Sequence, residues 1–188
     1  YSRVMCWVAV DRAIRLADKR SLPGPRVRWE KVRDEIYYDV MNNFWDEEFQ
    51  AFVQAKGAKV MDASTLIMPL VRFISPTDRR FLSTLKRIEK ELVEDSLVYR
   101  YNDQGAPDGL TGKEGTFCMC TFWYVECLAR AGRVQEARFF FEKMSGYANH
   151  LGLYAEELGP RGEHLGNFPQ AFTHLALISA ASNLNRAL

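Results

Sequence analysis

Hydrophobic residues recur along this chain with a helical period, and the periodic segments are of two kinds. In the first kind nearly every position is apolar, as in VMCWVAVDRAIRLA and AFTHLALISAA, which predicts helices buried on most sides. In the second kind an apolar stripe lies opposite a charged face, which predicts helices at the surface. The first kind covers residues 2–18, 62–73, 117–131 and 169–184, and the second covers residues 26–42, 77–94 and 134–149.

The two kinds alternate along the sequence, and this order predicts the fold. Successive apolar segments begin about 50–60 residues apart, a long and irregular repeat of helix pairs. An inner ring of helices wrapped by an outer ring explains the alternation. We therefore expect an all-α protein, an α/α toroid of which this chain supplies about three and a half helical hairpins.

The connections between the predicted helices differ in length. Those from an inner to an outer helix are short, whereas those from an outer to an inner helix are long: residues 43–61, 95–116 and 150–168. Long loops in compact domains are usually functional. Because each one precedes the N-terminus of an inner helix, we expect all three at one mouth of the ring, with short strands in AFVQ and LVYRY.

Several residues have the chemistry of helix ends. Pro69 lies inside the second apolar segment and is expected to end or kink that helix. Ser75 can cap the following helix, with Pro76 at its first position. Asp62 lies where an N-cap belongs, and capping is favoured there over a substrate contact. Thr116 can cap the third apolar helix.

Composition indicates a globular protein without special partners. Hydrophobic residues make up 47% and charged residues 26% of the 188 residues. A net charge of +1 without a dense Lys/Arg cluster argues against a nucleic-acid partner. No apolar run approaches the roughly 20 residues that span a bilayer, so no membrane partner is expected.

The four cysteines fit neither a zinc site nor a disulfide framework. We interpret them as small buried thiols, which favours a reducing, cytoplasmic location. We expect neither a metal nor a cofactor. The chain opens in mid-pattern at YSRVMCWVAV without an initiator methionine, so we expect that the natural N-terminus lies upstream.

The three long connections are rich in carboxylates and aromatic rings. Carbohydrate sites use aromatic faces against sugar rings, and carboxylates for hydroxyl groups and acid–base chemistry, so these loops suggest a sugar site. The side chains concerned are Trp45, Asp46, Glu47, Glu48 and Phe49 in the first, Tyr99, Tyr101, Asp103, Asp108 and Glu114 in the second, and Tyr154, Glu156, Glu157 and Glu163 in the third.

Some of these side chains can be placed individually. With a threonine as the helix cap, Glu114 is free to face the cleft. Tyr1 and Arg3 begin the first inner helix, at the same mouth, and are candidate ligand contacts. Trp7 and His174 lie inside apolar segments and are expected in the core.

Glu156 and Glu157 are adjacent, and neighbouring residues of an extended backbone point in opposite directions. One carboxylate can therefore face the cleft while the other faces solvent or pairs with Arg161. The residues alone leave open which of the two does so.

Several stretches resemble a known family. EGTFCMCTFWYVECLARAGRVQEA and LGLYAEELGPRGEHLGNFPQAFTHLALISAA are similar to the bacterial branch of glycoside hydrolase family 15, which includes glucoamylases, glucodextranases and some trehalases. YSRVMCWVAVDRAIRLA and MDASTLIMPLVRF also resemble that family, so the resemblance covers nearly the whole chain. It implies an (α/α)6 toroid that hydrolyses α-glucosidic bonds with inversion.

The resemblance also implies roles for single residues. The family's general base is the first glutamate of a Ser-Glu-Glu or Ser-Glu-Gln stretch before the last inner helix. Here the stretch is AEE, which makes Glu156 the base, with Ala155 in place of serine. Tyr154 and Glu157 beside it are candidate sugar contacts. The general acid belongs to a Trp-Glu motif upstream, so residues 1–188 are expected to be the C-terminal part of one catalytic domain.

Two alternatives stay open. LARAGRVQEARFFFEKM also looks like a helical-repeat scaffold that binds partner proteins, although such repeats are about 34 residues long and the spacing here is longer. The substrate could be trehalose, maltose, isomaltose or a starch end.

For the isolated chain we expect no hydrolysis. We also expect self-association through the open edges of a half ring, with Val4, Trp7, Val8 and Ile14 exposed.

Overall fold

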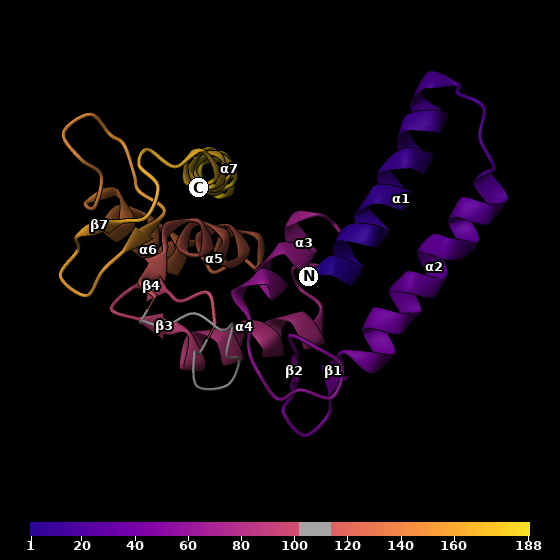
Figure 1. The fold of residues 1–188 in the computed structure, drawn as a ribbon, viewed down its shortest axis with the longest axis horizontal. Coiled ribbons are helices and arrows are strands. Elements are labelled where there is room, and N and C mark those ends of the chain that lie inside the picture. The colour runs from indigo at the N-terminus through magenta and orange to yellow at the C-terminus, as the bar shows by residue number, and fades with distance from the viewer. Residues whose placement is uncertain (102–113) are drawn as a thin grey trace.

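The computed structural model describes residues 1–101 and 114–188, which form an arc of helices (Figure 1). At one end α1 and α2 form a hairpin, and at the other end α5, α6 and α7 pack together. The helices are α1 (Ser2–Arg20), α2 (Arg26–Asn43), η1 (a 3-10 helix, Ala63–Leu66), α3 (Ile67–Leu70), α4 (Arg79–Glu91), α5 (Cys118–Arg130), α6 (Val134–Ser145) and α7 (Ala171–Ala187). The strands are β1 (Trp45–Asp46), β2 (Ala51–Phe52), β3 (Val93–Glu94), β4 (Leu97–Val98), β5 (Thr116–Phe117), β6 (Glu157–Leu158) and β7 (His164–Leu165).

The predicted all-α fold of alternating inner and outer helices is confirmed. Helix α5 is an inner helix, and most of its side chains are buried because α6, α7, η1 and β4 pack around it. Helix α4 is an outer helix with one buried stripe. The residues of this stripe are Phe81, Leu85, Ile88 and Leu92, all at most 1% exposed.

The second apolar segment is not the continuous helix predicted for residues 62–73. It folds as η1 followed by the single turn of α3. Pro69 lies in this turn, and the helix ends one residue later, as expected for a residue that cannot donate a backbone hydrogen bond. Arg72 then has a φ of 65°, and the Phe73 N–H donates to the Met68 carbonyl at 2.9 Å, which closes the helix end.

The N-terminal edge of the arc also differs from expectation. Val4, Trp7 and Ile14 are buried, so the prediction that they are exposed is wrong. The physical reason is that α2 folds back on α1, and that Phe73 lies against Trp7 with ring centroids 5.1 Å apart. Val8 is half-buried against the same core.

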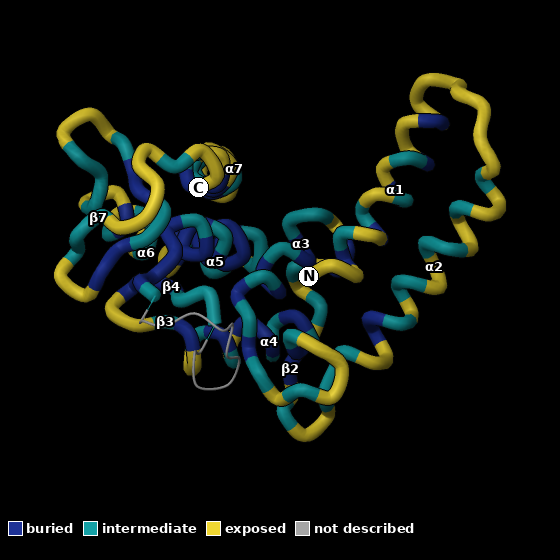
Figure 2. The backbone as a smooth tube through the Cα atoms, in the orientation of Figure 1, coloured by how far each residue is buried: buried dark blue, intermediate teal, exposed yellow. Residues whose placement is uncertain are grey.

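The prediction that α1 and α7 are buried on most sides is wrong, whereas the expected open edge of a half ring is found at α7. In the described chain each packs one face inward and leaves the other open to solvent (Figure 2). On α7 the open face is strongly apolar, with Phe172, Leu175 and Ile178 exposed to 64%, 62% and 65%. The periodicity correctly indicates apolar helices but not how many neighbours each one has.

Two predicted helix caps are wrong and one is confirmed. Helix α4 begins after Asp78, whose carboxylate accepts the Arg80 N–H at 2.8 Å, so Ser75 does not cap it. Thr116 lies in β5 and donates its hydroxyl to a strand carbonyl at 3.2 Å instead of capping α5. Asp62 does cap η1, accepting the Ser64 N–H at 2.7 Å.

The three long connections contact one another, as predicted. The first ends at Asp62, which forms a β-bridge with Tyr101 of the second. The second ends in β5, which pairs with β6 of the third. The expected strands in AFVQ and LVYRY are present as β2 and β4, each of two residues. Loops distant in sequence are thereby joined at one site.

The thiols are divided between surface and core. Cys118, Cys120 and Cys127 are buried as predicted, but Cys6 is exposed on the open face of α1, so that part of the prediction is wrong.

Within residues 1–101 and 114–188, no helix is both long and apolar enough to cross a membrane.

Candidate functional site

A small antiparallel sheet lies at the N-terminus of α5 and carries the adjacent glutamates. Its strand order is β5-β6-β7. Thr116 pairs with Leu158 across the first interface, and Glu157 pairs with Leu165 across the second. The sheet places the start of β6 directly beside the first turn of α5.

Glu156 is held at its backbone and at its carboxylate. Its N–H donates to the carbonyl of Asn167 at 3.0 Å, and its own carbonyl accepts the N–H of Cys118 at 3.0 Å. Carboxylate oxygen Oε2 accepts two hydrogen bonds from Asn167, one from Nδ2 at 2.8 Å and one from the backbone N–H at 3.1 Å. An ionised carboxylate accepts hydrogen bonds and can take a proton from a bound water.

Glu157 engages a different neighbour. Its Oε2 accepts the backbone N–H of Gly115 at 2.8 Å. Burial raises the pKa of Glu157 above its ordinary value, the hydrogen bond from Gly115 opposes this shift, and the negative charges of Glu114 and Glu156 add to it. A side chain at Gly115 would place its Cβ 2.5 Å from the Leu158 carbonyl oxygen, so glycine allows this close approach.

The two adjacent carboxylates thus separate as the extended backbone predicts, but neither pairs with Arg161. Arg161 instead lies with Glu163, which accepts its backbone N–H at 2.8 Å and approaches its guanidinium at 3.9 Å. The expected alternative partner is therefore wrong. The reason is that Arg161 and Glu163 share the tight turn between β6 and β7, which positions them for each other.

Glu114 is not free, contrary to expectation. Its carboxylate forms an ion pair with Arg100, and the Tyr101 hydroxyl donates to the same oxygen at 3.5 Å. The guanidinium of Arg100 also lies 4.4 Å from the ring centroid of Tyr101 and 4.8 Å from that of Phe117. Arg100 therefore joins the end of the second connection to the sheet that carries the glutamates.

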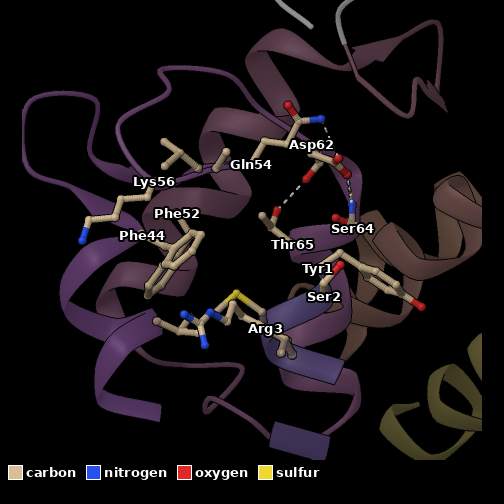
Figure 3. Close-up of a pocket in the computed structure, with 15 residues that line it drawn as sticks. Tyr1, Ser2, Arg3, Phe44, Phe52, Gln54, Lys56, Asp62, Ser64 and Thr65 are labelled. Atoms are coloured by element: carbon tan, nitrogen blue, oxygen red, sulfur yellow. Dashed lines mark hydrogen bonds between the residues drawn. The ribbon is translucent and has the colours of Figure 1, made fainter. Parts of the chain in front are cut away.

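Tyr1 and Arg3 lie apart from this cluster, in a cavity of about 390 Å³ between the start of α1 and the first long connection (Figure 3). Asp62, Gln54 and Lys56 supply further polar lining, and Phe44 and Phe52 are among the apolar lining residues. Tyr1 is 57% exposed, and Arg3 forms an ion pair with Asp39 at 3.3 Å.

Asp62 connects the two regions. It lines the cavity and caps η1, and the next residue, Ala63, donates its N–H to the Arg100 carbonyl at 2.8 Å. Tyr1 and Asp62 thus line one cavity, and the residue after Asp62 is hydrogen-bonded to Arg100, which pairs with Glu114. Gly115, the next residue after Glu114, donates its N–H to Glu157.

Tyr154, two residues before Glu156, packs against His174 of α7. Tyr154 is only 3% exposed, and its ring packs edge-on against Phe122 and His174. His174 is half-buried rather than in the core as expected, and its Nδ1 bonds to the Gln170 carbonyl at 2.8 Å. Its Nε2 is buried without a hydrogen-bond partner among the described residues.

Sequence reasoning missed two residues of this site. Asn167 lies within the family-like stretch LGLYAEELGPRGEHLGNFPQAFTHLALISAA and Arg100 within the predicted strand LVYRY, but the sequence assigns neither a role. The available signals were a polar side chain directly after a glycine and a cation flanked by tyrosines. Asp103 and Asp108 lie outside the described residues. Within the described chain, no group of three His, Cys, Asp or Glu side chains is placed to hold a metal ion.

Known proteins with similar sequences indicate the family of this chain. The model of glycosyl hydrolases family 15 matches residues 1–182. A trehalase of Mycobacterium tuberculosis strain H37Rv is 46% identical over 187 residues, covering 99% of this chain and 27% of that protein. A trehalase of Thermoplasma acidophilum is 46% identical over 189 residues, covering 100% of this chain and 32% of that protein. The chain thus spans about three-tenths of the length of these relatives.

Solved structures show the same fold. A wild-type glycosidase matches with a TM-score of 0.70 at 19% identity, over 85% of this chain and 45% of that one. A glycosidase variant in complex with glucose matches with a TM-score of 0.73, over 88% of this chain and 47% of that one. The helical-repeat scaffold gains no support from these matches. Because the family model matches nearly the entire sequence, the chain belongs to glycosyl hydrolases family 15.

Proposed function

We propose that residues 1–188 are the C-terminal part of a single catalytic domain that hydrolyses α-glucosidic bonds with inversion, and that Glu156 is its general base. One observation supports this assignment. Glu156 is bound at one carboxylate oxygen by two donors of the loop residue Asn167, whereas Glu157 is bound by the Gly115 N–H beside the sheet, and burial raises its pKa and so disfavours the ionised form that a base needs.

The proposed reaction needs two carboxyl groups. Glu156 takes a proton from a water molecule whose oxygen attacks the anomeric carbon, and the glycosidic bond breaks as the leaving oxygen takes a proton from a general acid. In inverting glycosidases the two groups are about 6.5–9.5 Å apart, which leaves room for that water. The acid is expected in the part of the domain that the longer relatives contain and this chain does not cover.

The proposed substrate is an α-linked glucosyl saccharide, with trehalose as the first choice. Four relatives at 43% to 46% identity are trehalases, which favours trehalose over maltose. Tyr1, Arg3 and Glu114 keep accessible surface and are the proposed sugar contacts. Tyr154 and Glu157 are proposed to support the site from within the fold, because one is buried and the other is hydrogen-bonded inside the sheet.

The test is the first product of the complete protein. Incubated with trehalose, it should release equal amounts of α- and β-glucose, the latter from the attacked ring, as followed by proton NMR before mutarotation. Glu156→Gln should slow this release by about 10²–10⁴-fold. Release of α-glucose alone would show retention and a nucleophilic carboxylate, and full activity of Glu156→Gln would remove Glu156 from the mechanism.

A further inference from the structure

We propose that Asn167 is a positioning residue that aims the Glu156 carboxylate during hydrolysis. This inference rests on the proposed role of Glu156 as general base. It adds a function for a loop side chain that neither the pattern of the sequence nor the family assignment singles out. Its support is the way in which two residues, eleven positions apart, are tied together.

The two residues are joined by three hydrogen bonds. The Glu156 N–H donates to the Asn167 carbonyl at 3.0 Å, while the Asn167 N–H and Nδ2 donate to Glu156 Oε2 at 3.1 and 2.8 Å. The bond from the Glu156 N–H fixes the backbone of the glutamate, and the two bonds to Oε2 fix the position of its carboxylate. Among the described residues both donors reach Oε2 and none reaches Oε1, so Oε1 is the oxygen left to bind water.

Gly166 lets the loop approach this closely. Its φ is +72°, a region that other residues rarely adopt. A Cβ at this position would lie 2.9 Å from Glu156 Oε2 and 3.0 Å from Glu156 Cβ. A side chain would therefore push the carboxylate away from the two donors. The glycine and the asparagine that follows it act as one unit around the carboxylate.

Holding the Glu156 carboxylate in place before substrate binds should favour catalysis. A free glutamate loses rotamer freedom when it is fixed, and contacts formed in advance supply that ordering. A displacement of about 1 Å at a reacting group can lower a rate on the order of 10²-fold. The Asn167 donors carry no formal charge, so they orient the carboxylate without forming an ion pair with it.

The test must separate positioning from a merely structural role in the loop. It uses four forms of the complete protein: the parent, Asn167→Ala, Glu156→Ala and the double variant. Turnover is measured with trehalose, and the two Glu156→Ala forms are also measured with sodium azide, a nucleophile that needs no base. Azide attacks the anomeric carbon as the leaving oxygen takes its proton from the acid.

We expect Asn167→Ala to lower kcat on the order of 10²-fold with little change in KM. In the Glu156→Ala background it should have no further effect on azide turnover, because the group on which it acts is gone. The same fold-loss in both backgrounds, or an unchanged kcat in the single variant, overturns the proposal. Parent-like turnover of Glu156→Ala would instead overturn the proposed function, which is a separate result.

Two more variants distinguish a loss of positioning from a loss of folding stability. Asn167→Asp has the same shape but replaces the Nδ2 donor by a second carboxylate oxygen, so it should lose at least as much kcat as Asn167→Ala. Asn149→Ala is the matched control, because Asn149 lies in the same segment between α6 and α7. Its Oδ1 accepts the N–H groups of Leu151 and Leu153, both at 2.9 Å, without contacting Glu156. It should lower thermal stability and leave kcat unchanged; parent-like kcat in Asn167→Asp also overturns the proposal.

Discussion

The carboxylate of Glu157 accepts the backbone N–H of Gly115 at 2.8 Å, and this contact ties together two chain segments 42 residues apart. It commits one of the two adjacent glutamates to the strand pair β5–β6, directly before α5 begins. The other glutamate is then bound by the loop that follows β7. The two adjacent glutamates therefore have different hydrogen-bond partners, although their positions in the sequence look equivalent.

Substitution of the two glutamates should have unequal effects on turnover. In the complete protein, Glu156→Gln should lower kcat by about 10²–10⁴-fold with little change in KM, because a general base acts in the transition state. Glu157→Gln should be much milder, since a glutamine oxygen can still accept the Gly115 N–H. Steady-state kinetics with trehalose compares them. If Glu157→Gln is the severe change, the roles of the two residues are reversed.

Glu157 should also affect the pH dependence of stability. Burial raises its pKa in the folded state above the ordinary 4.5, so its protonated form favours folding. This contribution is fully present below about pH 4.5 and is lost as the pH rises through the folded-state pKa. Glu157→Gln should therefore be at least as stable as the parent at neutral pH, with a flatter profile above pH 4.5, as measured by urea unfolding of the complete protein.

Glu163→Gln is the matched control for that measurement. Backbone hydrogen bonds, including one from Arg161, lower the pKa of Glu163, so the sign is opposite. Its contribution is present above the ordinary value of 4.5 and is lost as the pH falls through the lowered pKa. Equal pH profiles for the two variants would contradict the burial of Glu157.

Gly115→Ala should destabilise the strand pair. The added Cβ would lie 2.5 Å from a backbone carbonyl oxygen, which cannot move aside like a flexible side chain. We expect a loss of about 1–3 kcal/mol in the free energy of unfolding, together with reduced turnover. The control Gly146→Ala meets a carbonyl at 3.2 Å at a helix end and should cost less. Equal losses would show that β5 and β6 can separate freely.

The thiols should react unequally in the isolated chain. Cys6 is exposed, whereas burial raises the pKa of Cys118 to about 12 and also raises that of Cys120 and Cys127. Because the thiolate is the reactive form, a thiol reagent at neutral pH should modify one cysteine of the folded chain and all four after unfolding. Peptide mapping should identify Cys6, and rapid labelling of Cys120 would contradict the packing of α5.

The apolar face of α7 should drive self-association of the isolated chain. Phe172, Leu175 and Ile178 form a continuous exposed stripe, and such patches tend to be covered by a partner. Replacing Leu175 and Ile178 by glutamine should lower the apparent mass in light scattering. Leu151→Gln is the control, because Leu151 is 69% exposed but lies in a turn after α6 and not on α7. An equal effect of the control would indicate nonspecific aggregation.

The sequence by itself determined the helical class, the alternation of inner and outer helices, the buried stripe of α4 and the capping role of Asp62. These features depend on spacing along a helix or on a hydrogen bond between close neighbours. Such interactions are local, so residue order is enough to predict them. The resemblance to a family was likewise carried by contiguous motifs.

Only the tertiary structure decided what the long connections do with their polar side chains. Asn167 reaches Glu156 and Arg100 reaches Glu114 because each of these two loops folds back on itself, and Gly115 reaches Glu157 because the two loops meet at the start of α5. No periodicity encodes which donor meets which acceptor across such distances. The exposed faces of α1 and α7 have the same origin, since an apolar pattern states that a face can be buried, while the neighbouring elements decide whether it is.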